Sequence, residues 1–251
     1  MLVIALYERS PLTYRLKEGI LVGLLLAGLE ILQMVGLQLS TSADTVFISN
    51  LGMLLIPYGG WLLFKHKVSK QNNVALLLAI VGMYYLVGGV GGFGWGQLFL
   101  LLSAALMALY FLYLEKYGAE KKSHLLALLV QQFFTTTVVC ALVILFIGDS
   151  FTVSNSIVVP LLWQVVVFTT VPYILVQWAS RYADEMIAAV YDGVVEPLIG
   201  GIVSWGFFLE PATRANVMGG ILMVVAFAFA AIFSKKHFIR HSLKAITSLL
   251  R

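Results

Sequence analysis

The sequence predicts an all-α integral membrane protein with about eight transmembrane helices. Hydrophobic residues make up 61% of the 251-residue chain and charged residues only 11%, and the mean hydropathy is +0.96. A water-soluble domain cannot bury that much apolar surface, whereas helices of about 20 apolar residues satisfy their own backbone hydrogen bonds in lipid. The composition therefore places the chain in a bilayer.

Eight apolar segments separated by short polar connections are the predicted membrane helices. None of the connections is long enough to hold a soluble domain, so we expect the protein to act within or across the membrane. The segments cover residues 19–39, 44–64, 72–90, 95–115, 124–147, 157–179, 186–208 and 214–233.

Lysine and arginine fall almost entirely on one side of these helices. If the N-terminus is cytoplasmic, all but Arg214 of the 16 basic residues face the cytoplasm, as the positive-inside rule requires. We therefore expect a multi-pass protein of the cytoplasmic (inner) membrane with both termini in the cytoplasm. For the basic tail, residues 235–251, the spacing is consistent with an amphipathic helix on the anionic inner leaflet and equally with a frayed end.

An internal repeat is visible when the chain is compared with itself. At one constant offset Gln33 aligns with Gln177, Trp61 with Trp205 and Gly82 with Ala226, and the helix boundaries of 44–64 and 72–90 align with those of 186–208 and 214–233. Equivalent helices lie five apart in order, so an odd-numbered unit enters the membrane upside down in its second copy. Inverted repeats of this kind are typical of transporters.

The two halves carry motifs that resemble the EamA-like family of the drug/metabolite transporter superfamily. The motifs are Arg181-Tyr182-Ala183, Ala188-Ala189, Glu196-Pro197, Trp205, Glu210 and Gly219-Gly220 in the second half, and residues 38–43, 61–64 and 68–69 in the first. Members of that family have ten helices in two five-helix repeats. The resemblance implies three plus five helices here, without the first helix and most of the second: an incomplete first repeat over 1–91, a second repeat over 92–234, and the tail.

Polar and charged side chains inside the apolar segments are the candidate transport residues. A charge at membrane depth costs about 2.5 to 3.5 kcal/mol, so each one is a functional candidate, with helix packing as the alternative. A proline frees a backbone carbonyl and can kink a helix beside a cavity. The candidates for a substrate or ion path are Glu30, Gln33, Asn50, Gln177, Asp192 and Glu196, and those for helix kinks are Pro57, Pro172 and Pro197.

Other classes of function find little support in the sequence. The histidines lie in or near the predicted cytoplasmic loops and form no metal-binding pair, and no serine or cysteine stands in a nucleophile motif, so we expect neither an enzyme nor a cofactor or metal. The G-x-G-x-x-G string at 89–94 follows a membrane helix and not a strand, which argues against nucleotide binding. The basic residues occur in short clusters, which argues against nucleic-acid binding.

The leading hypothesis is a secondary transporter for uptake or efflux of a small organic metabolite or drug by alternating access. A proton is a candidate coupling ion, because two carboxylates four residues apart, Asp192 and Glu196, raise each other's proton affinity. The lipid bilayer is the expected environment, and a homodimer is a candidate assembly. The alternative is a truncated membrane subunit that does not transport and has an interaction or regulatory role.

Overall fold

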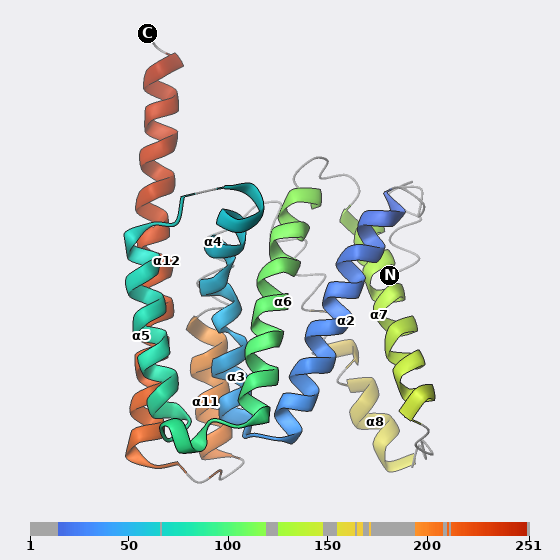
Figure 1. Cartoon of the computed structure of the whole chain (residues 1–251). Helices are drawn as coiled ribbons and strands as arrows, with labels where there is room; N and C mark the ends of the chain where they lie inside the picture. Colours follow the sequence, from blue (N-terminus) through green and yellow to red (C-terminus); the bar gives the residue numbers. More distant parts are fainter. Residues whose placement is uncertain are drawn as a thin grey trace. The chain divides into compact units, whose positions relative to one another are not determined.

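A computed structural model shows the chain as a set of helices (Figure 1). It describes residues 15–65, 67–118, 125–147, 155–163, 165–167, 171, 194–207, 210 and 212–249, and none of these forms a strand. Among these described residues, five stretches are long and apolar enough to cross a membrane: Leu16–Gln38, Ser42–Leu63, Trp95–Leu114, Ala127–Ile147 and Arg214–Ile232. The chain is thus an all-helical protein with several membrane-length helices.

The helices follow the apolar segments of the sequence closely. The predicted segments 157–179 and 186–208 lie only partly within the described residues, so the number eight stays a prediction. The helices are α2 (Leu16–Gln38), α3 (Ser42–Ser49), α4 (Leu51–Phe64), α5 (Lys70–Leu86), α6 (Trp95–Gly118), α7 (Leu125–Ile147), α8 (Asn155–Trp163), α11 (Glu196–Gly206) and α12 (Arg214–Leu249), with a short 3-10 turn, η1 (Val90–Gly92), before α6.

Two predicted segments differ from the structure in detail. The segment 44–64 is one apolar span, Ser42–Leu63, but it is interrupted at Asn50 between α3 and α4. There the Asn50 side-chain amide donates to the Val46 carbonyl at 2.8 Å, in competition with the backbone. The segment 72–90 ends as a helix at Leu86 because Gly88 and Gly89 take the left-handed φ values of 77° and 84°. The α12 backbone, in contrast, continues as one helix through the predicted tail as far as Leu249.

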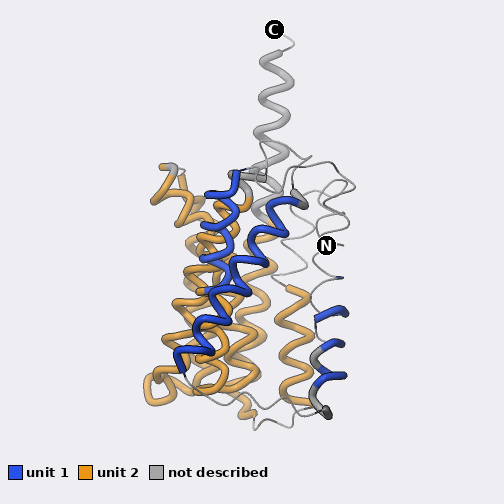
Figure 2. Tube along the Cα trace, turned by 90° about the vertical axis from the view of Figure 1, so that its right-hand side faces the viewer, with its two compact units in different colours: residues 1–27, 117–188 blue, residues 28–116, 189–251 orange. Residues whose placement is uncertain are grey.

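The chain divides into two compact units, which Figure 2 colours separately. Unit 1 contains residues 1–27 and 117–188, and unit 2 contains residues 28–116 and 189–251. Helix α2 contributes its first half to unit 1 and its second half to unit 2. Each unit therefore draws on both halves of the sequence, and the repeat boundaries at residues 91 and 234 stay a prediction.

In unit 1, small residues let α2 and α7 approach closely. A Cβ atom placed on Gly23 would lie 2.6 Å from the Thr135 Cβ and 2.8 Å from the Gln132 carbonyl oxygen. The Thr136 hydroxyl donates to the Gly23 carbonyl at 3.1 Å. Lipid provides no hydrophobic drive for helices to associate, so close backbone contact and interhelical hydrogen bonds of this kind hold the pair together.

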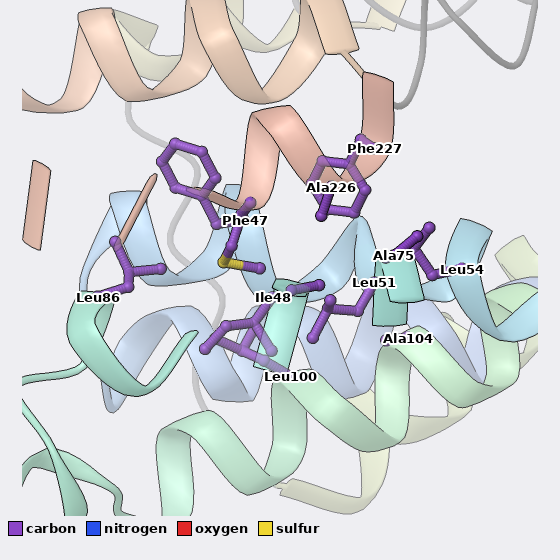
Figure 3. Close-up of a cluster of buried hydrophobic side chains, with 12 residues drawn as sticks. Phe47, Ile48, Leu51, Leu54, Ala75, Leu86, Leu100, Ala104, Ala226 and Phe227 are labelled. Atoms are coloured by element: carbon purple, nitrogen blue, oxygen red, sulfur yellow. The ribbon is translucent and has the colours of Figure 1, made fainter. Parts of the chain in front are cut away.

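In unit 2, the core gathers at the contact of α3, α4, α5, α6 and α12 (Figure 3). Large side chains from one helix face small ones from another, which brings the backbones close together. The buried cluster consists of Phe47, Ile48, Leu51, Leu54, Ala75, Ala79, Leu86, Leu100, Ala104, Met223, Ala226 and Phe227.

The most extensive helix contact in unit 2 joins α5 and α12, which run antiparallel. A Cβ atom on Gly219 would lie 2.5 Å from the Gly82 carbonyl oxygen and 2.3 Å from the Leu86 nitrogen. The Asn216 side-chain amide, in the first turn of α12, donates to the carbonyl of Leu86 at the end of α5. The two backbones are therefore in direct contact along a seam that only small residues permit.

A second antiparallel pair in unit 2 is formed by α3 and α11. A Cβ atom on Gly200 would lie 2.6 Å from Val46 Cγ1, and the Phe47 and Trp205 rings stack with centroids 5.8 Å apart. The second half of α2 packs against α6, where the Ser103 hydroxyl donates to the Leu29 carbonyl at 2.9 Å. These contacts position the helices at one end of unit 2, and the candidate site lies at that end.

Candidate polar pocket at one end of unit 2

A polar pocket of about 250 Å³ lies at the end of unit 2 where α3 begins. We call this end the acidic end, because it carries Asp44 and Glu210; the opposite end, with Lys65, Lys67 and Lys70, we call the basic end. The turn before α3, the α5 to α6 turn and the α11 to α12 connection all contribute to the pocket. The lining residues are Ser40, Thr41, Ala43, Asp44, Leu86, Val87, Gly92, Gln97, Trp205, Glu210 and Asn216.

The N-terminus of α3 forms one wall of the pocket and is capped from two directions. The Thr41 hydroxyl accepts a hydrogen bond from the Asp44 N–H at 3.0 Å. The two carboxylate oxygens of Glu210 accept hydrogen bonds from the Ser42 N–H at 2.8 Å and the Ala43 N–H at 3.2 Å. All three donors would otherwise be unpaired at the start of a helix, and a carboxylate is also favoured there by the helix dipole.

A chain of hydrogen bonds joins α3 to the start of α6. The Gln97 amide nitrogen donates to Asp44 Oδ2 at 2.8 Å, and the Gly94 N–H donates to the Gln97 amide oxygen at 2.9 Å. Asp44 and Gln97 are each only 6% exposed, so the carboxyl group is buried at the edge of the pocket with an amide as its partner. A buried carboxylate without a partner is costly. The Gln97 amide provides that partner, and the bond fixes the direction in which the Asp44 side chain points.

The pocket lining favours a ligand with a positive or hydrogen-bond-donating group. Two carboxylates, Asp44 and Glu210, take part in it, whereas no lysine, arginine or histidine does among the described lining residues. The amide groups of Gln97 and Asn216 are already engaged with Asp44 and with the Leu86 carbonyl. In the part of the chain that the structure describes, no three metal-binding side chains come together.

The break at Asn50 leaves buried polar atoms without partners. Asn50 is 3% exposed and Ser49 is 5% exposed, and neither Asn50 Oδ1 nor Ser49 Oγ has a hydrogen-bond partner among the described residues. An unpaired buried polar atom costs about 1 to 3 kcal/mol. Native proteins seldom keep such an unfavourable group without a functional role, so Asn50 remains a candidate for substrate contact.

The other sequence candidates that the structure describes lie in unit 2 and do not line the pocket. Glu30 is exposed and Gln33 half-buried on α2; Glu196 is exposed at the first position of α11. Pro57 lies inside α4, and Pro197 is buried in the first turn of α11. Gln177, Asp192 and Pro172 lie outside the described residues. Roles for all of these in transport or in kinks stay predictions.

Asp44, Gln97 and Glu210 were not among the residues predicted to form a site. Asp44 stands three residues after Thr41, which is the spacing of a helix N-cap with an acidic residue in the first turn, and that signal was available. Gln97 is 53 residues from Asp44 and Glu210 is 168 residues from Ser42. No local sequence pattern predicts those two contacts.

The G-x-G-x-x-G string at 89–94 is a turn between helices. Gly89 takes a left-handed φ of 84°, and Gly92 lies in η1 and lines the pocket. A Cβ atom on Gly92 would lie 1.6 Å from the Val87 carbonyl oxygen, so no larger residue fits this turn. The glycines serve a tight turn next to the pocket.

Comparison with known proteins relates this helical membrane protein to a transporter. Over 210 residues the chain is 25% identical to a protein of Archaeoglobus fulgidus that is described as an uncharacterized transporter. The matched region covers 84% of this chain and 67% of that relative. No protein-family model matches the chain. The chain is therefore a distant relative of a transporter, and membership of the EamA-like family stays a prediction.

Proposed function

We propose that the protein is a secondary transporter that moves a small organic metabolite or drug across the cytoplasmic membrane by alternating access. In this proposal the chain follows the EamA-like plan, the basic end faces the cytoplasm, and the pocket at the acidic end opens to the other side. The name of the distant relative supports transport as the class of function. Substrate, direction and coupling ion are open, with a proton as the candidate ion.

The observation that carries this proposal is the pairing of helices that the repeat makes equivalent. The predicted repeat equates the segment of α5 with that of α12, and the segment of α3 and α4 with that containing α11. In unit 2, α5 packs antiparallel against α12, and α3 packs antiparallel against α11. Paired equivalent helices are what two repeats of opposite topology would produce around a shared site.

The small residues of the α5 to α12 seam agree with the same relation. The repeat offset that aligns Gly82 with Ala226 also aligns Ala75 with Gly219. Gly82 and Gly219 approach each other in the seam, and their counterparts Ala226 and Ala75 are both fully buried in the same core cluster. A pseudo-twofold axis through the seam would exchange Gly82 with Ala226 and Gly219 with Ala75.

The sidedness of the proposal gives a direct prediction. With Cys140 replaced by serine, a cysteine at the exposed Ala212 should react with a membrane-impermeant maleimide added to intact cells. A cysteine at the exposed Lys65 should react only after the membrane is permeabilised, as should one at Arg181, because positive residues stay inside. If Lys65→Cys and Arg181→Cys label from opposite sides, the two repeats cannot be inverted copies.

Transport itself can be tested with vesicles that contain the purified protein. The probes are labelled amino acids, labelled nucleosides and a cationic dye, each compared with protein-free vesicles. A flux above the protein-free level for one class supports the proposal. No flux for any probe, with the protein folded, would favour the non-transporting membrane subunit.

The variant Asn50→Leu separates a transport role from a structural one. Leucine has nearly the same shape but removes the unpaired buried oxygen, so we expect thermal stability equal to or above that of the original chain. If Asn50 contacts the substrate, flux of the transported probe should fall at least about tenfold, which is roughly the 1.4 kcal/mol worth of one hydrogen bond. Thr137→Val, at an exposed hydroxyl bonded within α7, should leave flux unchanged. Undiminished flux in Asn50→Leu would remove Asn50 from the path.

A further inference from the structure

The contact of Glu210 with α3 is a link between two distant parts of the chain. Its carboxylate accepts the N–H groups of Ser42 and Ala43 at 2.8 Å and 3.2 Å, while the local cap, Thr41, serves only the N–H of Asp44. The N–H groups in the first turn of α3 are thus bonded partly by the local Thr41 and partly by Glu210 from the α11 to α12 connection. Loss of Glu210 would leave two donors unpaired at the start of the helix.

Helix α3 is the short first part of the apolar span Ser42–Leu63. It has eight residues and meets α4 at Asn50. Its main partner is α11, through the Phe47 and Trp205 rings and the close approach at Gly200. By comparison, the contacts of α11 with α12 are few. The Phe47 and Trp205 rings of this pair also lie beside Gly220 of α12, and Glu210 lies in the connection between α11 and α12.

The same contact borders the polar pocket. Thr41, Ala43 and Asp44 from the start of α3 line the pocket, as do Trp205 and Glu210 from α11 and the connection that follows it. Ala43 is only 3% exposed, so its side chain is shielded while the contact is made. Breaking the two Glu210 hydrogen bonds would free this wall and expose Ala43.

We propose that Glu210 is a latch that holds the start of α3 against the α11 to α12 connection and thereby controls access to the polar pocket. Release of its two hydrogen bonds lets the α3 wall move away and opens the pocket at the acidic end. This role rests on the proposed transport function, in which a site must open to one side at a time. The latch itself is a property of unit 2 and can be tested without a substrate.

The test measures how fast a maleimide labels a cysteine at Ala43 in the detergent-solubilised full chain, with Cys140 replaced by serine. We expect Glu210→Ala to raise the labelling rate about tenfold, because both hydrogen bonds are lost. Glu210→Gln retains one acceptor oxygen without the charge, so we expect an increase of about threefold. Arg214→Gln, which removes an exposed charge at the same end, should leave the rate within about twofold of the original.

A second cysteine separates local opening from general loosening. Ala108 on α6 is 3% exposed in the same unit, and a cysteine there should label no faster when Glu210 is replaced. An equal increase at both positions would mean that the whole unit loosens, which overturns the latch. An unchanged rate at Ala43 in both Glu210→Ala and Glu210→Gln would overturn it as well. If Glu210→Ala does not fold, the Gln variant decides.

The outcomes also separate the latch from the proposed function. Labelling that depends on Glu210 in a protein without measurable flux would retain the latch and reject transport. Flux in vesicles together with labelling that ignores Glu210 would retain transport and reject the latch.

Discussion

Replacement of Gly219 by leucine is expected to prevent unit 2 from folding. A Cβ atom at Gly219 would meet backbone atoms of α5 at 2.3 to 2.8 Å, and backbone atoms cannot rotate out of the way as side chains do. Overpacking usually costs about 1 to 3 kcal/mol, and it costs more where no side chain can yield. We expect Gly219→Ala to lower stability by about 3 kcal/mol and Gly219→Leu to yield no folded protein, as measured by thermal unfolding and gel filtration in detergent.

Gly206 provides a matched control for this substitution. It is also a helical glycine of unit 2, at the end of α11, but no heavy atom lies within 4 Å of the position that its Cβ would occupy. Alanine there should leave stability unchanged or raise it by up to about 1 kcal/mol, because alanine loses less backbone entropy on folding. Equal stability of Gly219→Leu and the original chain would show that α5 and α12 do not make the direct contact seen here.

The variant Gln97→Leu should lower stability by about 2 to 3 kcal/mol. The Gln97 amide nitrogen donates to the buried Asp44 carboxylate at 2.8 Å, and leucine leaves that charge without this partner. The removal of a charged group from water costs free energy, and a hydrogen bond in the protein offsets part of it. A buried charged group that loses this bond is therefore left with most of that cost. The measurement is thermal or denaturant unfolding of the purified chain in detergent.

The double variant Asp44→Leu with Gln97→Leu tests the cause of that loss. If the unpaired carboxylate is responsible, removal of both partners should restore most of the stability, because two apolar side chains can replace a buried polar pair at little cost. In contrast, the transport flux of the double variant should stay low, since the pocket then lacks one of its two carboxylates. A double variant as unstable as Gln97→Leu alone would assign the loss to packing.

The extent of most helices could be predicted because it depends on local properties. Apolar length located α2, α6 and α7 to within a few residues. The same reasoning found the span Ser42–Leu63 but not the one-residue interruption at Asn50 within it. It placed the end of α5 too late, because two left-handed glycines end that helix. Hydropathy averages over such single residues and therefore cannot locate a break within a segment.

The candidate site was predicted less well, for a different reason. Charged side chains were expected to act at membrane depth, where Glu30 and Glu196 would be costly, whereas the pocket lies at the ends of the helices. Asp44 stands at such an end, and Glu210 lies in a connection. Their significance comes from the groups that they bond, and those groups are far away in the sequence.

The sequence by itself determined that this protein is helical, that it belongs in a membrane, and which stretches are apolar enough to cross one. These features follow from composition and from the need of each backbone segment in lipid to bond within itself, which is a local requirement. Only the tertiary structure decided which helices pair, and that Glu210 caps α3 and Gln97 bonds Asp44. Those contacts join residues 168 and 53 positions apart, and they depend on where packing of small residues brings separate helices together.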